Sequence, residues 1–163
     1  MALLHAHAAE REIRPAPDRA ATVEIATRFG SYLFDSTYAI AMPAGLPGFP
    51  TARRFGLADL PDPRHGRFKL LQSLDGPEPA FIVMPLNLAD GPIDAADIDE
   101  ALDTLGIARE DAVLLLVVAT RKEPNGKGSA TVNLRAPIVL DLANRRARQY
   151  VLPNGRYPLR QAI

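Results

Sequence analysis

The side chains best suited to chemistry in this sequence are its three histidines, His5, His7 and His65. His5 and His7 form an H-x-H pair of the kind that can ligate a metal ion, but the segment around them gives no geometry for a third ligand. His65 lies by itself in a predicted loop at residues 61–66. The absence of cysteine excludes disulfides, thiolate zinc sites and cysteine nucleophiles. We therefore predict no metal and no cofactor.

The other arrangements that could support catalysis are weak. Residues 126–129, G-K-G-S, resemble the end of a phosphate-binding loop, but the earlier glycine is missing and the segment joins two predicted strands. No serine lies in a G-x-S-x-G elbow. Asp97 and Glu100 fall on a predicted helix, where solvated carboxylates are far commoner than a general acid. The sequence gives no support for an enzyme.

The charge balance argues against nucleic acid as a direct partner. Nineteen Lys and Arg residues match 19 Asp and Glu residues, whereas binding to phosphates normally needs a basic excess. Residues 94–111 hold seven acids and one base, and residues 143–160 hold five arginines and no acid. This asymmetry favours oriented protein contacts, although two solvated faces would give the same pattern.

The cellular compartment follows from what the sequence lacks. No apolar run approaches the roughly 18 residues that a membrane-spanning helix needs. The N-terminus does not combine a charged region with a continuous apolar run, so we do not expect a secretory signal. The absence of cysteine also suits a reducing compartment. We expect a cytoplasmic protein that does not contact the membrane.

The elements that must position any binding residues are predicted to form one domain. The chain has 163 residues, 47% of them hydrophobic, which is enough for a single core. Residues 1–21 are rich in alanine and lack strand alternation, so we expect a disordered tail or a short, poorly docked helix there. From residue 22 onward, short apolar runs rich in β-branched and aromatic residues are separated by Gly, Pro, Asn and Asp. The predicted strands are residues 22–27, 31–35, 38–42, 55–57, 68–74, 80–84, 112–120, 130–134, 137–142 and 148–152.

This pattern predicts a mainly β fold for residues 22–163, a small antiparallel β-barrel-like or sandwich domain with one short helix. The helix begins after Asp94, a residue type that favours the N-cap, and ends at Gly106. Its apolar residues recur at helical spacing and should pack across one mouth or face of the sheet. Asn125-Gly126 is a predicted hairpin turn, and residues 142–145 are another.

Three segments are unusual for a domain that needs only to be stable. Residues 43–49, P-A-G-L-P-G-F, surround an exposed-looking Leu46 and Phe49 with prolines and glycines that restrict the backbone. Residues 71–75, L-Q-S-L-D, lead through two prolines into an apolar strand. Residues 133–140, N-L-R-A-P-I-V-L, place a polar residue and a proline among apolar positions.

These segments, in this order, resemble the flagellar assembly factor FliW family. The motifs are P-x-G-L-P-G-F, L-Q-S-x-D-x-P-x-x-A-F, N-L-x-A-P-I-V, Gln149 before a late apolar strand, and R-Y-P-x-R at residues 156–160. The similarity covers roughly residues 29–160. It implies a compact β-barrel-like fold, a non-enzymatic role and two partners, flagellin and CsrA, an RNA-binding translational repressor. Flagellin that accumulates would occupy the protein and free CsrA to silence flagellin synthesis.

Residues for a partner-binding surface can be named on this basis. We predict contributions from Leu46, Pro47 and Phe49, from Gln72, and from the edge at Asn133 and Pro137. The alternative is that these residues merely shape turns and fill the core.

The predicted acidic helix supplies a second hypothesis. Asp97, Glu100 and Asp103 would meet a basic partner or repel RNA from a bound repressor. Two other functions stay open: a dedicated flagellin chaperone without a regulatory role, and a small RNA-binding barrel that uses Arg145, Arg146 and Arg148, although no aromatic residue lies among them for base stacking. We expect the free protein to be monomeric.

Overall fold

The computed structural model describes residues 21–163. The predicted tail at residues 1–21, except Ala21, therefore lies outside the described residues, as do His5 and His7. The described part contains one α-helix and short strands in the order that the sequence predicts. The strands are β1 Thr22–Thr27, β2 Gly30–Asp35, β3 Ile40–Ala41, β4 Arg54–Asp59, β5 Lys69–Ser73, β6 Ala80–Pro85, β7 Ala112–Lys122, β8 Gly128–Val132, β9 Ile138–Asp141, β10 Arg146–Gln149 and β11 Gln161–Ala162, and the helix is α1 Ala95–Leu105.

The strand pairings form a ring. Neighbours run in the order β7, β6, β5, β4, β3, β10 and β9, and β9 pairs again with β7. The pairs are antiparallel except for β3 and β10, which meet in parallel at Ala41 and Arg146. Beyond the ring, β8 pairs with the far half of β7 and carries β11 at its edge. The mainly β, barrel-like prediction is confirmed.

Strand β7 is buried on both faces in its first half. Leu115 belongs to the cluster inside the ring, with Phe55, Leu71 and Ile138. Its neighbours Leu114 and Leu116 point to the opposite face and join the cluster under α1. A strand covered on both sides has a continuous apolar run instead of alternation, which explains the unbroken A-V-L-L-L-V-V sequence at its start.

Helix α1 packs on the outside of the ring, as expected. Ile98, Ala101 and Leu102 are its buried residues. The helix ends at Gly106, whose φ of 66° is the left-handed conformation that glycine adopts readily. Asp94 occupies the N-cap position, as predicted, although its side chain makes no capping hydrogen bond. No helix within residues 21–163 has the length and hydrophobicity to span a membrane.

The β1–β2 hairpin covers another part of the outer surface. Ile25 and Phe34 pack there with Leu70 of β5 and Ala80 of β6. Phe34 lies so close to Gly56 that a Cβ at this glycine would come within 2.3 Å of the phenylalanine ring. Glycine is therefore the residue that lets this hairpin approach β4.

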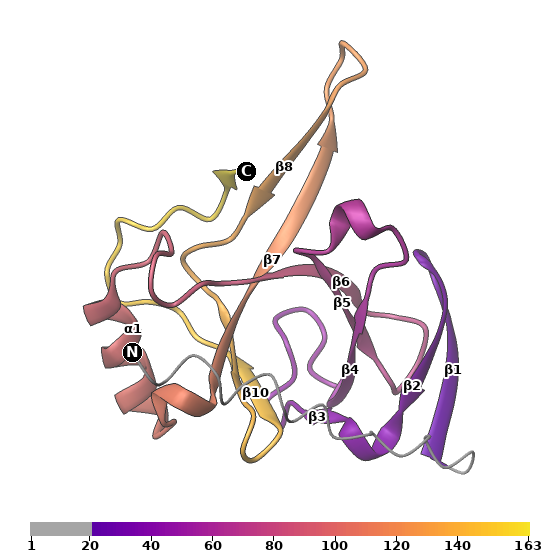
Figure 1. Cartoon of the computed structure of the whole chain (residues 1–163), viewed down its shortest axis with the longest axis horizontal. Helices are drawn as coiled ribbons and strands as arrows, with labels where there is room; N and C mark the ends of the chain where they lie inside the picture. The colour runs from indigo at the N-terminus through magenta and orange to yellow at the C-terminus, as the bar shows by residue number, and fades with distance from the viewer. Residues whose placement is uncertain (1–20) are drawn as a thin grey trace, which may run out of the picture.

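The β7–β8 hairpin projects from the rest of the molecule, with the predicted Asn125-Gly126 turn at its tip (Figure 1). The clearest differences from the prediction are two altered elements and one additional strand. Residues 36–38 form a 3₁₀ turn (Ser36–Tyr38) closed by the Asp35 carboxylate, which shortens β3. Strand β10 begins at Arg146 and ends at Gln149, earlier than predicted. Strand β11 was not predicted.

Candidate functional site

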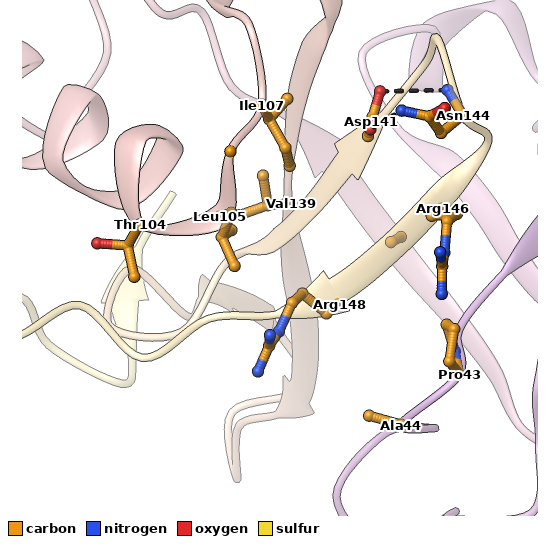
Figure 2. Close-up of a pocket in the computed structure, with 12 residues that line it drawn as sticks. Pro43, Ala44, Thr104, Leu105, Ile107, Val139, Asp141, Asn144, Arg146 and Arg148 are labelled. Carbon is orange, nitrogen blue, oxygen red and sulfur yellow. Dashed lines mark hydrogen bonds between the residues drawn. The ribbon is translucent and has the colours of Figure 1, made fainter.

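A cleft of about 560 Å³ lies where three segments singled out by the sequence meet. One wall is the start of the loop at residues 43–49, the second is the C-terminal end of α1, and the third is the β9–β10 hairpin (Figure 2). We call it the arginine cleft. Its lining residues are Pro43, Ala44, Thr104, Leu105, Gly106, Ile107, Val139, Asp141, Asn144, Arg146, Ala147 and Arg148.

Strand alternation explains why two arginines enter this cleft. Arg146 and Arg148 are two residues apart on β10, so their side chains leave the strand on the same side, while Ala147 between them is buried. Figure 2 shows both side chains on the side of Pro43 and Ala44. Both arginines are exposed and form no ion pair within residues 21–163. They can therefore bind an incoming carboxylate.

The other charged groups of the cleft already have partners. The Asp141 carboxylate accepts hydrogen bonds from the Asn144 side chain at 2.7 Å and its backbone N–H at 3.2 Å. The Asn144 side-chain bond is the main reason why the pKa of Asp141 is lowered. On the helix side, the carbonyls of Leu102 and Asp103 accept from Ile107 and Gly106. Arg146 lies opposite Asp141 on the β9–β10 hairpin, and its charge also lowers the pKa of that carboxyl, although the two form no ion pair.

The lining of the cleft has no catalytic pair. Thr104 donates its hydroxyl to the Glu100 carbonyl, and no histidine, serine, lysine or tyrosine lines the cleft. Across residues 21–163, no cluster of three His, Asp or Glu side chains is arranged to hold a metal ion. Chemically, the arginine cleft is suited to binding.

The loop at residues 43–49 differs from its prediction at one residue. Leu46 is buried, with 6% of its surface exposed, and it packs with Met42 and Phe55 inside the ring. It is held by reciprocal backbone hydrogen bonds with Phe49, at 2.8 and 3.3 Å. Pro47 is exposed and Phe49 is 36% exposed, with an edge-on contact to Phe81. The exposed-looking Leu46 was a wrong prediction, whereas Pro47 and Phe49 are accessible.

Gln72 is fully buried and is inaccessible to a partner in this structure. Its side-chain amide donates to the carbonyls of Ser73, Gly76 and Pro77 at 2.9 to 3.2 Å. Nearby, the Asp75 carboxylate accepts from two backbone N–H groups of residues 53–54. The L-Q-S-L-D segment therefore fixes a turn and joins it to β4.

Asp97 turns toward the C-terminal segment of the chain. Its carboxylate accepts from the Tyr157 hydroxyl, from Asn154 at 3.3 Å and from Arg156 at 3.5 Å. The Tyr157 bond is the largest cause of the lowered pKa of Asp97. The Tyr157 hydroxyl also accepts from the backbone N–H of Asp94, at 3.0 Å. Tyr157 thus anchors the start of α1, a role that the R-Y-P-x-R motif does not reveal by itself.

The remaining acids of α1 divide into two groups. Asp94 pairs with Arg156, and Asp99 pairs with Arg109. Glu100 and Asp103 are exposed, and their carboxylates have no partner among the described residues. Of the three acids predicted for this surface, Glu100 and Asp103 are therefore exposed without a partner among the described residues, whereas Asp94 and Asp99 are exposed but paired.

The edge at residues 133–137 is covered by the chain itself. The Asn133 side chain accepts from the Ala136 N–H at 3.0 Å, and Pro137 is buried. The C-terminal segment lies against this edge, since Leu134 donates to the Pro158 carbonyl and Tyr150 donates to the Pro137 carbonyl. The predicted docking edge is thus occupied, because residues 149–158 complete it.

Comparison with known proteins gives a consistent result. The family model described as FliW protein matches residues 24–163. The flagellar assembly factor FliW of Oceanobacillus iheyensis is 33% identical over 135 residues, covering 82% of this chain and 88% of that protein. That of Geotalea uraniireducens is 38% identical over 135 residues, with 82% and 79% covered. A crystal structure of the flagellar assembly factor FliW superposes with a TM-score of 0.64 at 24% identity, covering 86% of this chain and 96% of the other, which supports the same fold.

Proposed function

The chain belongs to the FliW family, and on this premise we propose that it is a non-catalytic, cytoplasmic flagellar assembly factor that binds flagellin and antagonises CsrA by partner switching. The observation that carries the proposal is the arginine cleft, where two exposed arginines that form no ion pair within residues 21–163 line a cavity without a catalytic pair. Switching requires comparable affinities for the two partners, because otherwise the tighter-binding partner always occupies the protein. Each tenfold difference in Kd corresponds to about 1.4 kcal/mol, so one or two contacts decide the outcome.

Charge complementarity suggests which surface serves which partner. A protein that binds RNA must present basic groups to the phosphates, so CsrA suits the exposed carboxylates of Glu100 and Asp103 better than it suits the cleft. Arg146 and Arg148 would then bind flagellin by pairing with carboxylates of that partner. Opposite charges across an interface mainly raise the association rate and set the specificity.

The test uses two double variants, each expected to weaken the binding of one partner only, with purified flagellin and CsrA titrated separately by calorimetry. Arg146→Glu combined with Arg148→Glu should raise the Kd for flagellin at least about tenfold and leave CsrA binding intact. Glu100→Lys combined with Asp103→Lys should do the reverse. Arg160→Glu, an exposed arginine outside the cleft, is the matched control and should change neither affinity. If the wild-type protein binds neither flagellin nor CsrA in these titrations, the proposed function is wrong.

A dedicated flagellin chaperone without a regulatory role is the second candidate. It is favoured by the pairing of Asp94, Asp97 and Asp99 within the protein, which leaves a small acidic surface for opposing RNA. Flagellin binding with no CsrA binding would select this candidate. A mobility shift with RNA alone would instead select an RNA-binding barrel.

A further inference from the structure

A second hollow, of about 470 Å³, lies at the base of the projecting β7–β8 hairpin and shares no residue with the arginine cleft. It is bounded by the turn end of the β1–β2 hairpin, the loop at residues 60–68, β6 and the far half of β7. We call it the edge groove. Its lining residues are Phe29, Tyr32, Leu60, Pro61, Asp62, His65, Phe68, Ile82, Val118, Thr120 and Ala130.

The edge groove exists because the sheet splits. Pairing between β6 and β7 ends at Val83 and Val117, yet β7 continues to Lys122 in pairing with β8. Figure 1 shows β7 and β8 leaving the other strands at this point. From Val118 onward, β7 has no partner strand on its β6 side within residues 21–163.

The hydrogen-bond pattern shows which backbone groups are left open. Leu86 of the β6 side donates to the Leu114 carbonyl at 2.8 Å, whereas the Val117 carbonyl accepts from Asn133 on the β8 side. Backbone groups alternate between the two edges of an antiparallel strand. The N–H and C=O groups of Val118, Thr120 and Lys122 therefore face the split and are available to a further strand.

The groove is also apolar where side chains of such a strand would lie. Val118 and Ile82 line it from the two sides of the split, and Phe68 lines it from the loop. Tyr32, another lining residue, has a buried hydroxyl with no hydrogen-bond partner among the described residues. A buried hydroxyl without a partner is costly, and because this one is closed to solvent, an occupant can accept from it only after the Tyr32 side chain turns toward the groove.

The charges beside the groove specify an acidic occupant. The acid that lines it, Asp62, is neutralised by Arg64 through contacts of 2.6 to 3.1 Å, and this bond lowers the pKa of Asp62. Arg67 holds its guanidinium 4.7 Å from the ring centroid of the lining residue Phe68, and Lys122 lies two residues beyond the lining residue Thr120 on β7; both are exposed and form no ion pair within the described residues. The unbalanced charge is therefore positive.

We propose that the edge groove binds an extended segment of a partner protein as an additional strand on β7, with apolar side chains at alternate positions and flanking carboxylates. Main-chain hydrogen bonds supply affinity in this mode, and side-chain pockets supply selectivity. The groove is distinct from the arginine cleft, and the binding proposed for it goes beyond the proposed function. A negative result for the groove would therefore leave the proposed function standing, and the reverse also holds.

The test uses the full chain and a synthetic peptide of roughly eight residues, the length of an ordinary strand, with alternating valine and threonine and a glutamate at each end. Titration should give saturable binding. Amide hydrogen exchange should slow at Val118, Thr120 and Lys122, while Ala119 and Arg121, which already face β8, should not change. A peptide with N-methyl groups on the edge that faces β7 should not bind.

Two matched variants locate the site. Thr120→Glu places a carboxylate in the groove and should raise the peptide Kd at least about tenfold. Ser129→Glu places the same group on the same hairpin outside the groove lining and should have little effect. Absence of binding to wild type, equal binding to both variants, or preference for a helical peptide would overturn the proposal. So would a stable dimer in sedimentation that protects the same amides, because the occupant would then be a second copy.

Discussion

Replacing Tyr157 by phenylalanine should destabilise the protein, because one hydroxyl serves three groups. Tyr157 is 4% exposed, and its hydroxyl donates to the Asp97 carboxylate while accepting from the Asp94 N–H and from Arg156, both at 3.0 Å. Leaving such partners unsatisfied costs about 1–3 kcal/mol. For a domain of this size, a loss near 2 kcal/mol lowers the Tm by roughly 4–8 °C.

The dependence of this loss on pH is the sharper part of the prediction. Because the pKa of folded Asp97 lies below its ordinary value, its contribution to stability is present above the unfolded pKa, near 4, and is lost as the pH falls through the folded pKa. Tyr157→Phe removes the main cause of the shift. The stability difference between wild type and variant should therefore be largest near neutral pH and should shrink in acid.

Thermal unfolding followed by circular dichroism, at neutral pH and below about pH 4, measures both effects. Tyr150→Phe is the matched control, since Tyr150 packs against the same core cluster while its hydroxyl has no partner among the described residues. Equal Tm values for wild type and Tyr157→Phe, or a difference that does not change with pH, would refute the reasoning.

Three further predictions concern stability. Gln72→Leu should cost about 1 kcal/mol in urea unfolding, because three backbone carbonyls lose their donor, while removal of the buried Gln72 Oε1, which has no partner among the described residues, offsets part of the loss; an unchanged midpoint would contradict this. Gly56→Ala should cost about 1–3 kcal/mol, since its Cβ would overlap the Phe34 ring, whereas Gly128→Ala, which has open space, should be nearly neutral. Tyr32→Phe should stabilise the free protein by about 1 kcal/mol by removing an unsatisfied hydroxyl; a lower Tm would show that the hydroxyl is satisfied.

Local sequence patterns predicted most of the strands and the helix, because these elements depend on short-range alternation and turn residues. They failed where contacts between residues far apart in the sequence determine the structure. Strand β11 has two residues and no alternation, and it exists because Gln161 pairs with Val132 of β8. Strand β10 ends early because Pro137, which lies opposite Tyr150, has no N–H to donate back, although Tyr150 and Leu152 still donate to the Pro137 and Arg135 carbonyls in the same register.

The candidate site was predicted less well than the fold. The sequence drew attention to the loop at residues 43–49, the acidic helix and the arginine cluster, and these segments do meet at one cleft. It could not show that Leu46 faces inward or that Gln72 is buried, because the motifs that contain them are as compatible with filling the core as with binding a partner. The edge groove was not predicted, because the separation of β6 from β7 produces no recognisable pattern in the sequence of either strand.

The closure of the ring has a consequence for synthesis on the ribosome. Strands β9 and β10, which join β7 to β3, are followed by the segment that holds α1 through Tyr157. A nascent chain that has reached β8 must therefore keep the edges of β3 and β7 open, and open edges invite aggregation. The wall that carries Arg146 and Arg148 is made after the other two walls of the cleft, so a product terminated before β10 would lack the arginine cleft.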